Sequence, residues 1–320
     1  MKKPKTLREA IRYFSDEQVC IDTVARARWP KGPVCPACEH TEHYYLATQR
    51  RWKCKDCKRQ FSVKLGTIFE DSAVSLDKWL CALWMLTNCK NGISSYEIHR
   101  ALGVTQKTGW FMLHRLRLAM QTGSLEKLGG KSKEVEVDES FIGGAARFMH
   151  AARRKRMIQV RGVGSKAAAF GILERGGEIR AFAVPNRRKA ALQTTIHAHV
   201  KDETPIYSDA LLSYQGLRAR YQHEVIDHAR KYVEGRVHTN GVENFWSLFK
   251  RSIKGTYVSI EPFHMQRYLD EQVFRYNNRA ILPVKPRNDG DRFDKVLSQI
   301  AGKRLTYKEV TGKVGETTVN

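Results

Sequence analysis

The sequence predicts a mixed α/β layer domain that follows a small cysteine-bearing unit and a helical region. Three observations predict this order. Two Cys-x-x-Cys pairs lie between residues 35 and 57, apolar residues recur at helical spacing between 76 and 120, and strand-like alternation begins at Val135. The polar, glycine-bearing stretch 123–133 separates the helices from the strands, so we expect a domain boundary there. A chain of 320 residues is long enough for two or three folded units.

The cysteine pattern predicts a zinc ribbon in residues 31–66. Four thiols form a C-x2-C-x15-C-x2-C frame, and this spacing fits the corners of one tetrahedral zinc ion. The expected ligands are Cys35, Cys38, Cys54 and Cys57. The fifteen residues between the pairs are long enough for a hairpin that returns the second pair to the first. Two separate redox motifs are the alternative, but two pairs at this spacing favour a single structural zinc ion.

The charge balance predicts a nucleic acid as the partner. The chain carries 56 Lys and Arg against 33 Asp and Glu, a formal net charge of +23 and a pI near 9.8. Phosphate neutralises such a charge with release of counterions, which gives strong, salt-dependent and largely sequence-independent affinity. The sequence has no run of 18 apolar residues and no apolar signal segment at its start. We therefore expect a cytoplasmic protein that does not bind a membrane.

The two ends of the chain differ in pattern. Residues 1–30 favour N-terminal helices, with Thr6 and Ser15 as N-caps and Pro30 as the end. Residues 286–320 are polar and basic, and we expect a basic tail there.

Residues 72–125 predict a helical region that is similar to a helix-turn-helix. A short helix ends at a turn with Gly103, and a second helix covers residues 106–120. Lys107 and Arg115 lie on this second helix and are candidate DNA contacts. A plain helical spacer is the alternative, because helical hairpins with glycine turns are common.

Residues 131–285 predict the α/β domain, a mixed sheet with flanking helices. Strands are expected at 135–141, 167–173, 178–184, 205–208 and 224–226, with a helix at 189–200. The basic run Arg153, Arg154, Lys155 and Arg156 lies between the first two strands. It is either a contact to the DNA backbone or a solvated group of charges.

Three carboxyl groups lie on three separate elements of this domain. We expect Asp138 to end a strand beside the turn at Gly143-Gly144 and Asp209 to end a later strand, and Glu243 lies beside the apolar stripe of a helix. Carboxylates that crowd together repel one another unless cations hold them, and Mg²⁺ prefers carboxylate oxygen. Two such ions about 4 Å apart can promote an in-line phosphodiester displacement.

A structural interpretation of the same acids is also open. Asn240 and Glu243 have the spacing of an N-cap and its capping-box partner, and the two aspartates could be ordinary strand-end acids. Glu134 and Glu136 alternate onto the strand face of Asp138. We expect these two glutamates to be exposed at the start of the strand.

The ordered motifs of the chain resemble those of bacterial insertion-sequence transposases that join an N-terminal zinc ribbon to a DDE-type domain. The match covers roughly residues 15–280, with the ribbon and the acidic blocks in the same order. The motifs are His238-Thr239-Asn240-Gly241-Val242-Glu243-Asn244-Phe245-Trp246-Ser247, Lys250-Arg251, Gly255-Thr256-Tyr257, Val135-Glu136-Val137-Asp138-Glu139-Ser140, Gly143-Gly144 and Tyr207-Ser208-Asp209.

The resemblance implies an RNase H-like catalytic domain that cuts the ends of a mobile element and joins the freed 3′-hydroxyls to target DNA. It implies Asp138 and Asp209 as ligands of two Mg²⁺ or Mn²⁺ ions, and Lys250 as a downstream basic partner that meets DNA phosphate. Arg251 lies beside Lys250 and is a further candidate DNA contact. Double-stranded DNA is the implied partner, bound by a homodimer or a larger synaptic complex associated with the nucleoid.

The third ligand is either Glu243 or Asn240. Some relatives place an asparagine in this role, and the sequence has both residues, 34 and 31 positions after Asp209. We favour Glu243, because a charged carboxylate binds Mg²⁺ more strongly than an amide does.

Two other functions are consistent with the same residues. One is a DNA-binding regulator without catalytic activity, built on an inactive enzyme core. The other is a structure-selective nuclease or resolvase that cuts DNA without joining strands. The task of the ribbon is also open, between reading terminal repeats, contacting a second subunit and folding the N-terminal part.

Overall fold

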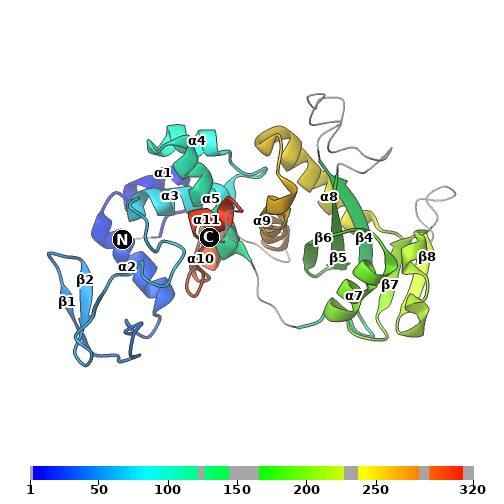
Figure 1. Ribbon diagram of the computed structural model, residues 1–320, viewed down its shortest axis with the longest axis horizontal. Helices are drawn as coiled ribbons and strands as arrows, with labels where there is room; N and C mark the ends of the chain where they lie inside the picture. The colour runs from blue at the N-terminus through cyan, green and yellow to red at the C-terminus, as the bar shows by residue number, and fades with distance from the viewer. Residues whose placement is uncertain (1–2, 122–125, 144–165, 227–236, 281–287, 313–320) are drawn as a thin grey trace, which may run out of the picture. The chain divides into compact units, whose positions relative to one another are not determined.

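The structure is a computed structural model that describes residues 3–121, 126–143, 166–226, 237–280 and 288–312 (Figure 1). The chain divides into two compact units. Unit 1 combines Met1–Gln121 with Asn278–Asn320, and unit 2 is Thr122–Asn277. No helix within the described ranges is long and apolar enough to cross a membrane.

Unit 1 holds a small antiparallel sheet and a set of packed helices. Its elements are α1 (Leu7–Tyr13), α2 (Glu17–Arg28), β1 (His43–Leu46), β2 (Arg51–Cys54), β3 (Gln60–Phe61), α3 (Leu76–Asn88), α4 (Ser95–Leu102), α5 (Gln106–Met120), α10 (Asp289–Leu297) and α11 (Tyr307–Val310). Helix α3 is buried along most of its length and contacts α1, α2, α5 and α10.

Side-chain caps define where several of these helices begin. The Thr6 hydroxyl accepts the Glu9 N–H at the start of α1, as predicted. Asp16, rather than the predicted Ser15, caps α2 by accepting the Gln18 N–H. Gly103 ends α4 with φ of 59°, a left-handed conformation that glycine adopts without strain.

The C-terminal segment differs from the predicted tail. Its described part forms α10 and α11, and α10 places Phe293 in the unit 1 core, where it contacts the rings of Phe14 and Trp84. The sequence 286–320 is polar on average, so the few apolar residues that α10 buries on one face did not stand out.

Arg115 is a structural residue of unit 1, which corrects its prediction as a DNA contact. Its side chain is buried, and its guanidinium donates to the carbonyl oxygens of Leu305 at 2.9 Å, Ile68 at 3.1 Å and Glu70 at 2.7 Å. Helix α5 is buried along most of its length after Gly109. Arg115 therefore joins three segments of the unit that are far apart in sequence.

Unit 2 is a mixed sheet with helices on both faces (Figure 1). Its elements are β4 (Val135–Ile142), β5 (Ala167–Glu174), β6 (Ile179–Val184), α7 (Lys189–His199), β7 (Pro205–Asp209), η2 (Leu212–Tyr214), η3 (Leu217–Ala219), β8 (Gln222–Ile226), α8 (Asn240–Ser252), η4, a π-helix (Ile253–Tyr257), η5 (Pro262–His264) and α9 (Met265–Asn277). This confirms the predicted mixed sheet with flanking helices.

The described strands follow the order β6-β5-β4-β7-β8. Strand β4 pairs antiparallel with β5 and parallel with β7, and β7 pairs parallel with β8. One face of the sheet packs against α7, where Val135, Val137 and Ile206 are buried with Leu192 and Ile196. The other face packs against α8 and α9.

Helix α8 lies close to the sheet because β5 carries a glycine beneath it. A Cβ atom on Gly171 would lie 2.9 Å from Trp246 Cζ2 and 3.0 Å from Val242 Cγ2. Gly171 is the β5 residue paired with Asp138 on β4. The N-terminal half of α8 therefore packs over the part of the sheet that carries Asp138.

Candidate metal centres

Two turns with the same backbone hydrogen-bond pattern carry the four cysteines of the ribbon. The N–H of Cys35 donates to the carbonyl of His40, and the N–H of Cys54 donates to the carbonyl of Arg59, each at 3.0 Å and five residues on. Glu39 and Lys58, each four residues after the first cysteine of its pair, have φ of 61° and 59°. Strands β1 and β2 form the hairpin that brings the second turn back to the first.

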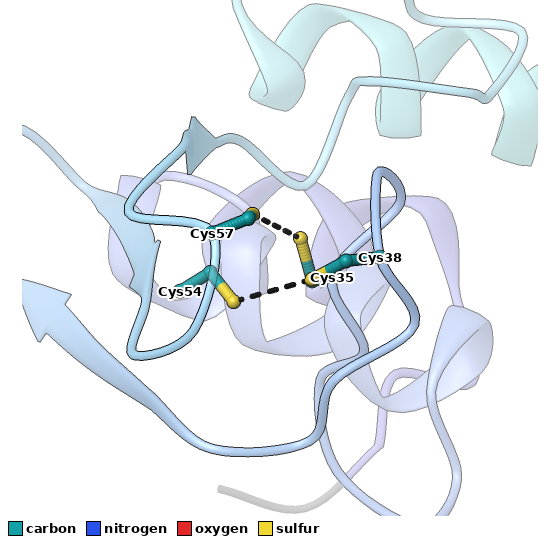
Figure 2. Close-up of side chains that lie close together, drawn as sticks. All are labelled: Cys35, Cys38, Cys54 and Cys57. Carbon is teal, nitrogen blue, oxygen red and sulfur yellow. Dashed lines mark hydrogen bonds between the residues drawn. The ribbon is translucent and has the colours of Figure 1, made fainter.

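The four sulfur atoms fit one zinc ion (Figure 2). They lie within 4.8 Å of one another, with Cys35 Sγ 3.6 Å from Cys57 Sγ and Cys38 Sγ 3.5 Å from Cys54 Sγ. A tetrahedron with Zn–S bonds of about 2.3 Å places its sulfurs about 3.8 Å apart. The structure thus brings the four predicted cysteines into one group that could hold zinc, and a bound zinc ion would hold the two turns together.

Aromatic rings join the ribbon to the end of α2. Trp52 on β2 stacks on Phe61 on β3, and Trp29, which follows α2, contacts both rings edge-on. Tyr44 and Tyr45 on β1 remain exposed. A small sheet with so few buried side chains has a small apolar core, so we expect its fold to depend on bound zinc.

Asp138 and Asp209 lie on neighbouring strands and on one face of the sheet. Asp209 ends β7 as predicted, whereas Asp138 lies inside β4 and not at its end. Val135 pairs with Ile206 and Glu136 pairs with Tyr207 in the parallel ladder of β4 and β7. Extending this register by two residues aligns Asp138 with Asp209, because side chains two apart point to the same face.

Glu243 reaches the same face from the first turn of α8. Thr239 is the N-cap residue of this helix, and its hydroxyl donates to Glu243 Oε1 at 2.6 Å. Asn240 is therefore the first helical residue and not an N-cap, so the capping-box interpretation of Asn240 and Glu243 is wrong. Both side chains are exposed.

The charges of three other acids act on the carboxyl group of Asp138. Burial, together with the negative charges of Glu139, Asp209 and Glu243, raises the pKa of Asp138 to about 8. Such repulsion is what a divalent cation relieves, so the donor set is suited to Mg²⁺ or Mn²⁺.

The three carboxyls do not form one compact group of donors. Among the described residues, the groups of three or more donors within 4.8 Å of one another include the four cysteines but not these three carboxyls.

Two further carboxylates matter in addition to the predicted three. Glu139 was not singled out from the sequence, and the burial of Glu136 was predicted wrongly. Glu139 accepts a hydrogen bond from the Tyr214 hydroxyl at 2.7 Å, and burial raises the pKa of this glutamate. Glu136, predicted to be exposed, is 1% exposed and accepts the Val242 N–H of α8 at 3.0 Å. The alternation of Glu134, Glu136 and Asp138 along one strand face was the available signal.

The predicted DNA contacts have different environments. Lys107 is exposed in the first turn of α5, with its Nζ atom 4.7 Å from the ring centre of Tyr307. Lys250 and Arg251 are exposed on α8. The basic run of Arg153, Arg154, Lys155 and Arg156 lies outside the described residues.

Removal of one zinc ligand should unfold the ribbon. We expect Cys54→Ser to lose the bound zinc, because structural zinc contributes about 10–16 kcal/mol to the folding of small zinc units. Zinc content by atomic absorption and proteolysis of residues 31–66 measure the effect. Cys89→Ser, outside the ribbon, is the control and should keep its zinc; a Cys54→Ser protein with full zinc content would contradict the assignment.

Replacement of Asp138 should stabilise unit 2 when no divalent cation occupies the carboxyl site. Between its ordinary pKa near 3.8 and its folded pKa of about 8, Asp138 takes up a proton on folding, so unit 2 loses stability as the pH rises through this window. We expect Asp138→Asn to have the higher melting temperature, with a gap that widens from pH 4 to pH 8. Calorimetry in magnesium-free buffer measures it, with exposed Asp202→Asn as control; a gap independent of pH would contradict the raised pKa.

Two family models match the chain in the order of its two candidate metal centres. A model described as a transposase zinc-ribbon domain matches residues 15–60, and a model described as an ISXO2-like transposase domain matches residues 127–277. The first contains all four cysteines, and the second contains the three carboxyls and the whole sheet of unit 2.

Two curated proteins are similar to the chain. An uncharacterized protein in transposable element ISH50 of Halobacterium salinarum is 28% identical over 254 residues, which cover 75% of this chain and 84% of the relative. An uncharacterized transposase-like protein of Haemophilus influenzae is 33% identical over 99 residues, which cover 31% of this chain and 80% of the relative. Together with the two domain matches, they show that the chain belongs to the insertion-sequence transposase family with an N-terminal zinc ribbon and a DDE-type transposase domain.

Proposed function

We propose that the protein is an active DNA transposase that cleaves the ends of its insertion sequence and joins their 3′-hydroxyls to target DNA. The observation that carries this proposal is the shared sheet face of Asp138 and Asp209, where Glu243 contributes to the raised pKa of Asp138. The family supports the reaction, and the mixed sheet with helices on both faces supports an RNase H-like fold for unit 2.

Each carboxyl has a defined role in this proposal. Asp138 and Asp209 would hold the divalent cations, and Glu243 would complete the ligand set from α8. The bound cations would activate the attacking oxygen and stabilise the leaving oxygen of the phosphodiester. Glu243 is preferred to Asn240 because its charge acts on Asp138 and because the Thr239 hydroxyl orients its carboxylate.

Basic side chains supply the affinity for DNA. Lys250 lies seven residues after Glu243, so it shares the same side of α8 about 10 Å further along the axis. Lys250 and Arg251 are placed to contact the DNA backbone beside the carboxyls. Lys107 is a further contact, restricted to the first turn of α5 because the rest of that helix is mostly buried.

Assembly follows from the reaction rather than from a surface of the chain. An element has two ends, and joining both to one target requires two active sites held together. We therefore propose a homodimer or larger synaptic complex on DNA.

Asp209→Asn should abolish cleavage and leave DNA binding intact. The substitution removes a charged metal ligand. It also removes one negative charge, so it does not reduce the electrostatic attraction between the basic protein and DNA. Cleavage and strand transfer are measured on labelled element ends with Mg²⁺ or Mn²⁺, and binding by gel shift. Asp202→Asn, an exposed aspartate paired with Arg220 at 3.0 Å, is the matched control and should remain fully active.

The outcomes separate the three functions. Full cleavage by Asp209→Asn would refute the assigned site. Cleavage by the unmodified protein without joining would indicate a nuclease or resolvase, and binding without cleavage would indicate a regulator.

The same assay decides between the two candidate third ligands. We expect Glu243→Gln to lose cleavage at all metal concentrations that support the unmodified protein, and Asn240→Ala to retain it. Both residues are exposed, so neither change should lower the free energy of unfolding by more than about 0.5 kcal/mol. The reverse pattern would assign the ligand to Asn240.

A further inference from the structure

A single arginine contacts β4, β7 and the residues that lead into β4 and α8, and these three elements carry the proposed metal ligands. Arg175 follows β5 at the turn into β6, and its backbone N–H donates to the carbonyl of Glu134 at 2.9 Å. Its side chain is 19% exposed and points back over the sheet toward β4, β7 and the start of α8.

The contacts to β4 are two ion pairs. Arg175 Nε lies 2.7 Å from Glu136 Oε1, and Nη1 lies 2.8 Å from Glu134 Oε2. Both glutamates alternate with buried apolar residues, on the same face as Asp138 two residues further along. The fork of the guanidinium thus sets the position of the strand that carries the first proposed ligand.

The contact to β7 is a cation–π interaction. The guanidinium carbon lies 4.3 Å from the ring centre of Tyr207, which is buried two residues before Asp209. One charged group therefore bridges the strands of Asp138 and Asp209 at equivalent positions in their register, since Glu136 pairs with Tyr207.

The contact to α8 is made at its N-terminus. Arg175 Nη2 donates to the carbonyl of His238 at 2.8 Å and lies 3.0 Å from His238 Nδ1. His238 precedes Thr239, whose hydroxyl holds Glu243. Glu136 adds a second link, because its other oxygen accepts the Val242 N–H, one of the first-turn donors that a helix cannot satisfy itself.

The approach of Glu136 to α8 depends on a glycine. A Cβ atom on Gly241 would lie 2.8 Å from Glu136 Oε2 and 2.5 Å from Leu173 Cδ2. The carboxylate also lies where a helix N-terminus favours negative charge. Because Glu136 is 1% exposed, its ionised form needs the ion pair with Arg175 to remain at this position.

We propose that Arg175 is a positioning residue that fixes β4, β7 and α8 relative to one another, so that Asp138, Asp209 and Glu243 bind their cations together. This inference rests on the proposed function. Arg175 acts through Glu134, Glu136, Tyr207 and His238 and is not itself a metal ligand, since a guanidinium has no acceptor atom.

Mn²⁺ affinity distinguishes a positioning role from a general structural role, because loss of a purely structural contact would lower stability without changing the affinity for the metal. The probe is Mn²⁺ added to the zinc-loaded, full-length protein without DNA, with free Mn²⁺ counted by electron paramagnetic resonance. We expect Arg175→Lys and Arg175→Gln to weaken Mn²⁺ binding about 10- to 100-fold, the usual effect of removing groups that orient metal ligands. Lysine keeps the positive charge but lacks the planar guanidinium with its several N–H donors, so Arg175→Lys should not bind Mn²⁺ as the unmodified protein does. The Val242 N–H should also exchange faster with solvent.

Arg180→Gln is the matched control. Arg180 lies on β6 in the same sheet, and its guanidinium pairs with Glu178 at 2.8 Å and donates to the Glu126 carbonyl at 2.6 Å. Its side chain is 12% exposed, so its removal costs comparable packing. We expect this variant to bind Mn²⁺ as the unmodified protein does. If Arg175→Gln does not fold, Glu134→Gln removes the more exposed of the two ion pairs and should weaken Mn²⁺ binding by a smaller factor.

The failure of this inference differs from the failure of the proposed function. Unchanged Mn²⁺ affinity in Arg175→Lys, with weakened affinity in Asp209→Asn, overturns the role of Arg175 and leaves the catalytic site standing. A melting temperature that falls equally in the Arg175 and Arg180 variants, with no difference in Mn²⁺ affinity, also overturns it. Unchanged affinity in Asp209→Asn overturns the proposed metal site and this inference with it.

Discussion

The arrangement of unit 2 depends on how the buried carboxylate of Glu136 is neutralised. A carboxylate with 1% exposure is costly unless charged and hydrogen-bonding partners surround it. Arg175 supplies the charge and the first turn of α8 supplies an N–H. Satisfying this one group therefore draws the β5–β6 turn and the start of α8 to β4. Asp138 and Glu243 lie on the two elements that this requirement brings together.

The two candidate metal centres are held by different kinds of structure. In the ribbon, each cysteine pair lies on one short turn with its own backbone hydrogen bond and a left-handed residue, so ligand geometry is local. In unit 2, each carboxyl comes from a different element, and their separation depends on strand register and on the seating of α8. A local site keeps its geometry when the rest of the molecule changes, whereas a site assembled from distant elements needs additional contacts to hold it.

This difference also decides what could be predicted from the sequence. Spacing predicted the four ribbon ligands and alternation predicted the strands of the sheet, because both signals reside in a few consecutive residues. The burial of Arg115 and Glu136 was not predicted, since a charged side chain is buried by partners that are remote in sequence. Helix α10 was missed for a related reason, because the apolar partners of Phe293 lie in α3 and beside α1. The structure leaves the catalytic roles of Asp138, Asp209 and Glu243 as a proposal supported by their placement.

The chain is strongly basic, yet it gathers carboxylates at one place in unit 2. The net charge of +23 attracts DNA without regard to sequence, while Asp138, Glu139, Asp209 and Glu243 together repel a phosphate and one another. Burial already disfavours the ionised form of Asp138, so this arrangement destabilises the folded protein even when no DNA is bound. Divalent cations would remove both repulsions at once. In the proposed function, phosphate therefore binds at these carboxyls only together with metal, and this confines the proposed chemistry to one part of a strongly basic protein.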